Sequence, residues 1–124
     1  MPKAKPLISI VDDDESMREA IKGLMRSLGY RVEAVASAPE FLSSPHVQRT
    51  SCLIADMQMP GMTGLERHQR LSSSGKPIPT ILITADPDDG VRERALSAGV
   101  LGYLSKPFEE DDLLACVRSA LTRS

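Results

Sequence analysis

The chain alternates between short continuous apolar runs and longer segments in which apolar residues recur at helical spacing. Continuous runs of three to five residues, rich in branched side chains, are typical of strands that a parallel sheet buries on both faces. The runs of this kind are residues 7–11, 52–55, 80–83 and 102–104. Residues 31–35 alternate polar and apolar side chains, which predicts a further strand with one more exposed face. We therefore expect five strands.

Helical spacing and end signals predict five helices between and after these strands. The first helix is capped by Asp14 or Ser16 and ended by Gly29, and capping boxes at Ser37 and Thr63 open the second and third. Asp86 and Pro87 open the fourth helix, which Gly99 ends, and the last helix starts near Glu109. Strands that alternate with helices, joined by right-handed crossovers, predict a doubly wound α/β domain with a parallel sheet and helices on both faces.

Composition narrows the class of protein further. A chain of 124 residues fits one domain with one core. With 41% hydrophobic and 26% charged residues and a net charge of -2, it has the composition of a soluble globular protein, and the charge indicates neither a nucleic-acid partner nor a membrane. Since no apolar run could span a membrane and the first residues lack the apolar centre of a secretory signal, a cytoplasmic location is expected.

The cysteines and histidines carry no predicted chemistry. Cys52 and Cys116 occupy apolar positions of a predicted strand and a predicted helix and share no metal-type spacing, which favours buried free thiols. His46 falls in a polar loop and His68 in a predicted helix, far apart in the sequence. We assign neither histidine a role.

Polar residues follow four of the predicted strands. They are Asp12 and Asp13, Asp56, Thr84, and Lys106. The carboxyl ends of parallel strands share one edge of the sheet, so these side chains are expected to converge there. Like charges about 4 Å apart repel by roughly 4 kcal/mol at an effective dielectric near 20, so three carboxylates require a cation among them. Mg²⁺, which binds carboxylates together with phosphate oxygens, suits this set and indicates phosphate chemistry.

Four motifs stand in one order along the chain: Val11-Asp12-Asp13, Asp56 with Met59-Pro60-Gly61, Thr84-Ala85, and Lys106-Pro107-Phe108. Together they resemble the receiver domain of bacterial two-component response regulators, from about Leu7 to Leu121. The resemblance implies a flavodoxin-like fold with strand order 2-1-3-4-5. It also implies a single receiver domain over residues 1–124, with a core at about 7–121.

The resemblance implies a role for each matching residue. Asp56 matches the phosphoacceptor, which takes a phosphoryl group from a sensor histidine kinase. Asp12 and Asp13 match the acidic pair that holds Mg²⁺, or Mn²⁺ in its place, together with Asp56 and the backbone carbonyl of Gln58. Lys106 matches the lysine that reaches the phosphoryl oxygens. Such a domain is not an enzyme toward other substrates and catalyses only its own phosphorylation and dephosphorylation.

Further matches concern the response to phosphorylation. Thr84 matches the switch hydroxyl, and Tyr103 the aromatic side chain that turns inward. This change alters the face formed by the fourth helix, the fifth strand and the fifth helix, where similar proteins dimerise or bind an effector domain or partner protein. The charges that this chain supplies there are Arg92, Arg94, Asp111 and Asp112.

Gln58 and Asp86 match two variable positions that tune the lifetime of the phosphoryl group. Asp86 is interpreted mainly as a helix cap, because Pro87 follows it. The bond between Lys106 and Pro107 is usually cis in similar proteins, which would direct the lysine back to the site.

Two alternative functions remain open at the level of sequence. Asp12-x-Asp14-x-Ser16 loosely resembles the motif of haloacid-dehalogenase-type phosphatases, in which Asp12 would be the nucleophile. A receiver-like interaction module with a vestigial pocket is a second alternative. The chain looks most similar to receivers that precede a helix-turn-helix DNA-binding domain, but it contains no such element and is expected to contact no nucleic acid. The sequence leaves open the cognate kinase, the oligomeric state, and whether the receiver acts alone.

Overall fold

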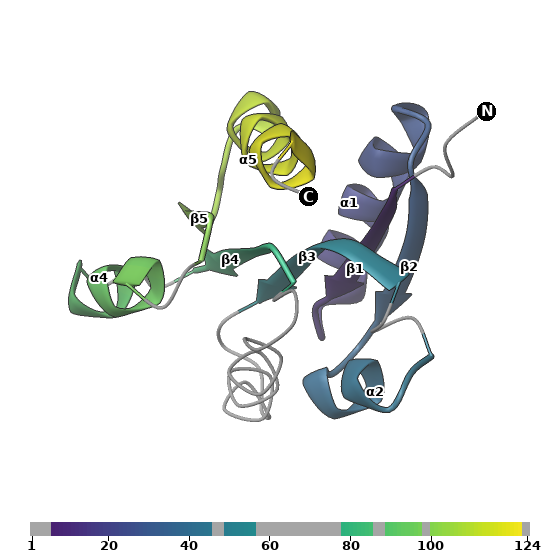
Figure 1. The fold of residues 1–124 in the computed structure, drawn as a ribbon, viewed down its shortest axis with the longest axis horizontal. Coiled ribbons are helices and arrows are strands. Elements are labelled where there is room, and N and C mark those ends of the chain that lie inside the picture. Colours follow the sequence, from purple (N-terminus) through teal and green to yellow (C-terminus); the bar gives the residue numbers. More distant parts are fainter. Residues whose placement is uncertain (1–5, 46–48, 57–77, 86–88, 98–99, 123–124) are drawn as a thin grey trace.

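The computed structural model describes residues 6–45, 49–56, 78–85, 89–97 and 100–122. Its centre is a five-stranded parallel sheet with the order β2-β1-β3-β4-β5, which confirms the predicted fold class and strand order (Figure 1). The strands are β1 (Leu7–Val11), β2 (Arg31–Val35), β3 (Thr50–Asp56), β4 (Thr80–Thr84) and β5 (Gly102–Ser105).

The register of the sheet brings the carboxyl ends of four strands to one edge. Val11, the last residue of β1, pairs with Ala55 in β3. Asp56 pairs with Ile83 in β4, and Thr84 pairs with Ser105 in β5. The residues that follow β1 and β5, and those that end β3 and β4, therefore share this edge.

Four helices lie in the described part of the chain: α1 (Glu15–Ser27), α2 (Ala38–Leu42), α4 (Asp89–Ser97) and α5 (Glu110–Thr122). Asp14, not Ser16, caps α1, because its side chain accepts hydrogen bonds from the N–H groups of Ser16 and Met17. Gly29 follows with a φ of 89°, the left-handed conformation that glycine adopts without steric cost. Ser37 caps α2 and accepts from the N–H of Glu40, as its capping box predicts.

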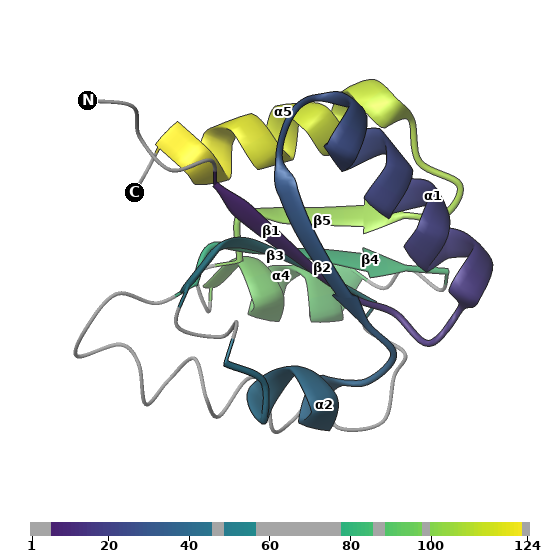
Figure 2. The same ribbon diagram turned by 90° about the vertical axis from the view of Figure 1, so that its right-hand side faces the viewer.

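The core has two layers, one on each face of the sheet (Figure 2). Helices α1 and α5 cover one face through Ile21, Met25, Leu113 and Val117. On the other face, where α2 and α4 lie, Phe41 of α2 packs with Leu53 and Leu82. Each strand of the interior contributes to both layers, which explains the continuous apolar runs in the sequence.

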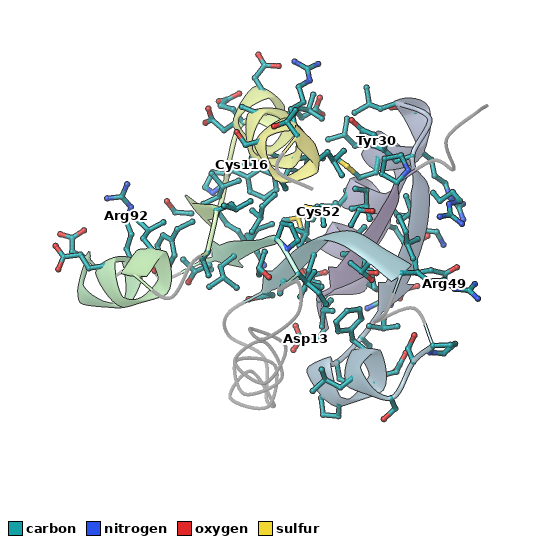
Figure 3. All side chains as sticks on the ribbon, in the orientation of Figure 1. Asp13, Tyr30, Arg49, Cys52, Arg92 and Cys116 are labelled. Carbon is teal, nitrogen blue, oxygen red and sulfur yellow. The ribbon has the colours of Figure 1, made fainter. Side chains whose placement is uncertain are left out.

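Helix α5 approaches the sheet closely at Gly102. A Cβ atom at this position would lie 2.7 Å from Cys116 Sγ and 3.4 Å from Ile81 Cγ2. Both cysteines are free thiols, as predicted, and they belong to the layer between the sheet and the helices α1 and α5 (Figure 3). Cys52 is buried as expected, whereas Cys116 is only half-buried. Burial raises the pKa of the Cys52 thiol to about 12.

Some boundaries differ from those expected. Strand β3 begins two residues earlier than predicted and includes Asp56, and β5 extends to Ser105. Three predictions lie outside the described residues. They are the helix opened by Thr63, the placement of His46 and His68, and the start of the fourth helix at Asp86. No helix among the described residues is long and apolar enough to span a membrane.

Candidate functional site at the carboxyl edge of the sheet

Asp12 is held at the junction of β1 and α1 through its main chain and its side chain. Its N–H donates to the carbonyl of Val35, 3.2 Å away, which continues the pairing of β1 with β2. Its Oδ1 accepts the N–H of Asp14 at 2.9 Å. The residue is only 2% exposed. Its second carboxylate oxygen, Oδ2, faces the ammonium of Lys106.

The carboxylates of Asp12, Asp13 and Asp56 form one cluster. One oxygen from each lies within 4.8 Å of the others. Asp12 and Asp56 are buried, whereas Asp13 is exposed beyond the carboxyl end of β1 (Figure 3). Among the described residues, the sheet edge thus presents a set of hard oxygen ligands.

Lys106 brings a positive charge to this cluster from the end of β5. Its Nζ donates to Asp56 Oδ2 at 3.1 Å and lies 3.9 Å from Asp12 Oδ2. The Lys106 N–H donates to the carbonyl of Thr84 at 2.7 Å, which continues the pairing of β5 with β4. The bond between Lys106 and Pro107 is cis, as expected from the resemblance. Residues 12, 56 and 106, far apart in sequence, therefore meet at this edge.

The environment alters the pKa values of two of these groups. Burial raises the pKa of Asp12, and the nearby charge of Asp56 acts in the same direction, while the Asp14 N–H and the Lys106 ammonium only partly offset it. Burial by itself lowers the pKa of Lys106. The hydrogen bond to Asp56 and the charges of Asp12, Asp56 and Asp14 outweigh burial and raise this pKa. One ammonium does not balance three carboxylates, so the cluster favours a further cation.

The donor set fits a divalent cation of the hard class. Mg²⁺ is usually held by one or two carboxylates together with waters and phosphate oxygens, and the cluster offers three carboxylates with spacing that one ion can bridge. Two of these carboxylates come from successive residues and the third from a neighbouring strand.

Thr84 and Tyr103 occupy neighbouring strands on the same face of the sheet. Tyr103 pairs with Leu82, two residues before Thr84, and both Leu82 and Tyr103 contribute to the core layer beside α2 and α4. Thr84 is 2% exposed, and Tyr103 is half-buried. Thr84 and Tyr103 therefore lie on the face of the sheet that α2 and α4 cover.

The charged residues predicted for the face of α4, β5 and α5 lie on the expected helices where they are described. Arg92 is exposed on α4 (Figure 3), and Asp111 and Asp112 are exposed in the first turn of α5. The side chain of Arg94 lies outside the described residues, as do Gln58 and Asp86.

Arg18 also lies at the site and was not predicted from the sequence. Its Nη1 donates to the backbone carbonyl of Asp12 at 2.8 Å. The available signal was a basic residue one turn into the helix that follows the acidic pair. The contact between Arg18 and Asp12 depends on how α1 packs beside β1, and the spacing of apolar residues along the chain does not show this packing.

Comparisons with known proteins agree with this geometry. The family model described as the response regulator receiver domain matches residues 8–118, and the chain belongs to this family. The response regulator protein TmoT of Ectopseudomonas mendocina is 40% identical over 121 residues, which cover 98% of this chain and 55% of that protein. The transcriptional regulatory protein FixJ of Azorhizobium caulinodans is 33% identical over 124 residues, covering all of this chain and 58% of FixJ.

A solved structure shares the fold along nearly its whole length. It is a response regulator receiver protein from Burkholderia phymatum, 43% identical, with a TM-score of 0.77 and coverage of 95% of this chain and 96% of that one. By contrast, this chain spans only about half the length of the curated relatives it matches.

Proposed function

We propose that Asp56 accepts a phosphoryl group from the phosphohistidine of a sensor histidine kinase, with Mg²⁺, or Mn²⁺ in its place, bound at the same site. The observation that carries this proposal is the meeting of three carboxylates, with oxygens within 4.8 Å of one another, and an ammonium 3.1 Å from Asp56 Oδ2. Asp12, Asp13 and Asp56 would hold the ion, with the carbonyl of Gln58 as a further ligand. Family membership also supports a cytoplasmic location.

The reaction requires a carboxylate to attack another anion. An Asp56 oxygen forms a bond to phosphorus as the bond between phosphorus and the histidine nitrogen breaks, and the product is an acyl phosphate. Lys106 offsets charge on the phosphoryl oxygens and helps to hold them in line with the nucleophile, so positioning and electrostatics dominate the catalysis. The bound ion would supply further neutralisation of the same oxygens. Apart from this transfer and the later hydrolysis of the acyl phosphate, which frees Asp56 and inorganic phosphate, we propose no enzymatic activity.

Phosphorylation would be transmitted through Thr84 and Tyr103. The phosphoryl group adds acceptor oxygens that can capture the Thr84 hydroxyl, and a shift of Thr84 leaves room for Tyr103 to turn inward. Because Tyr103 lies in β5, this would change the face made by α4, β5 and α5, where an effector domain, a partner protein or a second copy would bind. The name of the FixJ relative supports a role in transcription regulation. Gln58 and Asp86 would tune the lifetime of the acyl phosphate.

The geometry favours Asp56 over Asp12 as the nucleophile. Lys106 Nζ is 3.1 Å from Asp56 Oδ2 and 3.9 Å from Asp12 Oδ2, and Asp12 Oδ1 already accepts the Asp14 N–H. The phosphatase alternative requires the reverse assignment. Nothing in the geometry recommends a vestigial pocket, since every required type of side chain is present.

The test is to map the phosphorylated residue. The protein is incubated with acetyl phosphate and Mg²⁺, and the acyl phosphate is trapped by borohydride reduction and located by mass spectrometry. We expect the modification on Asp56, its complete loss in Asp56→Asn, and normal labelling in Asp111→Asn, which alters an exposed acid of α5. Labelling that persists in Asp56→Asn and maps to Asp12 would overturn the proposal in favour of the phosphatase. A protein that neither labels nor binds Mg²⁺ would instead be an interaction module.

A further inference from the structure

Arg18 reaches from the first turns of α1 back to the end of β1. Its half-buried side chain donates from Nη1 to the carbonyl oxygen of Asp12 at 2.8 Å. That carbonyl belongs to the peptide group that joins Asp12 to Asp13. The guanidinium therefore contacts the backbone between the two acids and does not pair with either carboxylate through this bond.

The other polar atoms of Asp12 have separate partners. Its N–H donates to Val35, its Oδ1 accepts from Asp14, and its Oδ2 faces Lys106 at 3.9 Å. The Asp12 carboxylate is thus held by Asp14 and Lys106 and does not depend on the hydrogen bond from Arg18. Asp13 is exposed, and the direction of its side chain depends on the orientation of the peptide plane that precedes it.

We propose that Arg18 is a positioning residue that fixes the Asp12–Asp13 peptide plane, so that the Asp13 carboxylate faces the same point as those of Asp12 and Asp56. Rotation of this plane would change the backbone angles on either side of it and swing the Asp13 side chain away from the cluster. This inference rests on the proposed function, because it assigns Arg18 to the divalent-cation site of that function.

The sign of a binding change separates positioning from simple electrostatics. Arg18 is always positively charged, and a nearby positive charge repels a divalent cation. If charge were its only influence, removal of Arg18 would tighten Mg²⁺ binding. If Arg18 orients the ligands, its removal weakens binding, as loss of outer-shell support typically costs 10-fold to 100-fold in metal affinity. A role in stability alone would lower the melting temperature and leave the affinity unchanged.

The experiment titrates the whole chain with Mg²⁺ and follows backbone amide shifts by NMR. Arg18→Met removes the donors but keeps an unbranched apolar stem, and Arg18→Lys keeps the charge without the planar fork. Arg26→Met is the matched control, because Arg26 is exposed in the last turn of the same helix. We expect the Kd of Arg18→Met to rise about tenfold, that of Arg18→Lys to rise less, and that of Arg26→Met to stay unchanged. The Asp13 amide should also shift in Arg18→Met before any Mg²⁺ is added.

An Arg18→Met variant that folds and binds Mg²⁺ as tightly as the unmodified protein, or more tightly, would overturn the inference. If Arg18→Met does not fold, Arg18→Lys decides alone: a higher Kd supports positioning, and an unchanged or lower Kd refutes it. Failure of the unmodified protein to bind Mg²⁺ would instead count against the proposed function, so the two failures are distinguishable.

Discussion

The ammonium of Lys106 lies 3.1 Å from the Oδ2 atom of Asp56, although fifty positions of sequence separate the two residues. Both are largely buried, with side-chain exposures of 18% and 5%. This pair places a fixed positive charge beside the proposed nucleophile. The carboxylates of Asp12 and Asp13 lie in the same cluster, so the single ammonium of Lys106 does not balance its negative charge.

Replacement of Lys106 should slow phosphorylation. Without its ammonium the phosphoryl oxygens lose one fixed cation, and loss of a single electrostatic contact of this kind costs about 100-fold in rate. We expect this loss in Lys106→Met, and only partial recovery in Lys106→Arg, because a guanidinium does not replace a compact ammonium. The rate of labelling by acetyl phosphate is the measurement. Lys22→Met, on α1, is the control; an equal effect there, or none at Lys106, would contradict the prediction.

Neutralisation of Asp12 should stabilise the protein at neutral pH when divalent cations are removed. Burial raises the folded-state pKa of this carboxyl, so its contribution to stability is largest at acid pH and is lost as pH rises through that raised pKa. Asp12→Asn avoids the loss, and we expect the free energy of unfolding at pH 7 to increase.

The gain from Asp12→Asn should shrink below about pH 4, where the carboxyl is protonated in both states. Urea unfolding in the presence of a chelator measures it. Asp111→Asn should show the opposite sign, since a carboxylate in the first turn of α5 favours the helix. A gain in Asp12→Asn that is independent of pH would show that burial of its charge is not the cause.

A methyl group at Gly102 should disturb the contact between β5 and α5. Gly102→Ala would place a Cβ atom 2.7 Å from Cys116 Sγ, and overpacking of this kind costs about 1–3 kcal/mol. Because the nearest atom is the sulfur, Cys116→Ala in the same chain should recover much of the loss. A double-mutant cycle of unfolding free energies tests the coupling. Simple additivity of the two changes would refute it.

The two thiols should differ in reactivity. Cys52 is fully buried with a pKa of about 12, so roughly one in ten thousand of these thiols is ionised at pH 8. Cys116 is only half-buried and should react first with N-ethylmaleimide, as followed by intact mass. Cys52 should react only when the protein is unfolded in denaturant. Comparable rates for both cysteines in the folded protein would contradict this expectation.

The proposed switch predicts a change in β5 that depends on Thr84. On addition of beryllofluoride, a phosphoryl mimic, amide resonances of β5 and α4 should shift, including those of Tyr103 and Arg92. Thr84→Ala should bind the mimic but lose most of these distant shifts. Thr122→Ala, at the exposed end of α5, should retain them. Unchanged shifts in Thr84→Ala would remove Thr84 from the route.

The elements of the fold could be predicted because their signals are local. Gly29 marks the end of α1 through its own backbone freedom, and Ser37 marks the start of α2 through a hydrogen bond to a residue three positions away. The run Ile81-Leu82-Ile83 reads as a buried strand because its side chains enter both core layers. The strand order and the site roles came from resemblance to a family, and the roles remain predictions that the experiments above test.

Local pattern alone determined the order of strands and helices in the described part of the chain, and that Asp12, Asp56, Thr84 and Lys106 stand at strand ends, although not every strand boundary. Only the tertiary structure decided that Lys106 lies nearer to Asp56 than to Asp12, that Cys116 needs a glycine opposite it, and that Arg18 contacts the peptide between the two acids. The physical reason is the distance along the chain over which each interaction acts. Helices and strands depend on residues a few positions apart, whereas the contacts of the site join residues that are distant in sequence and meet only when the helices pack against the sheet.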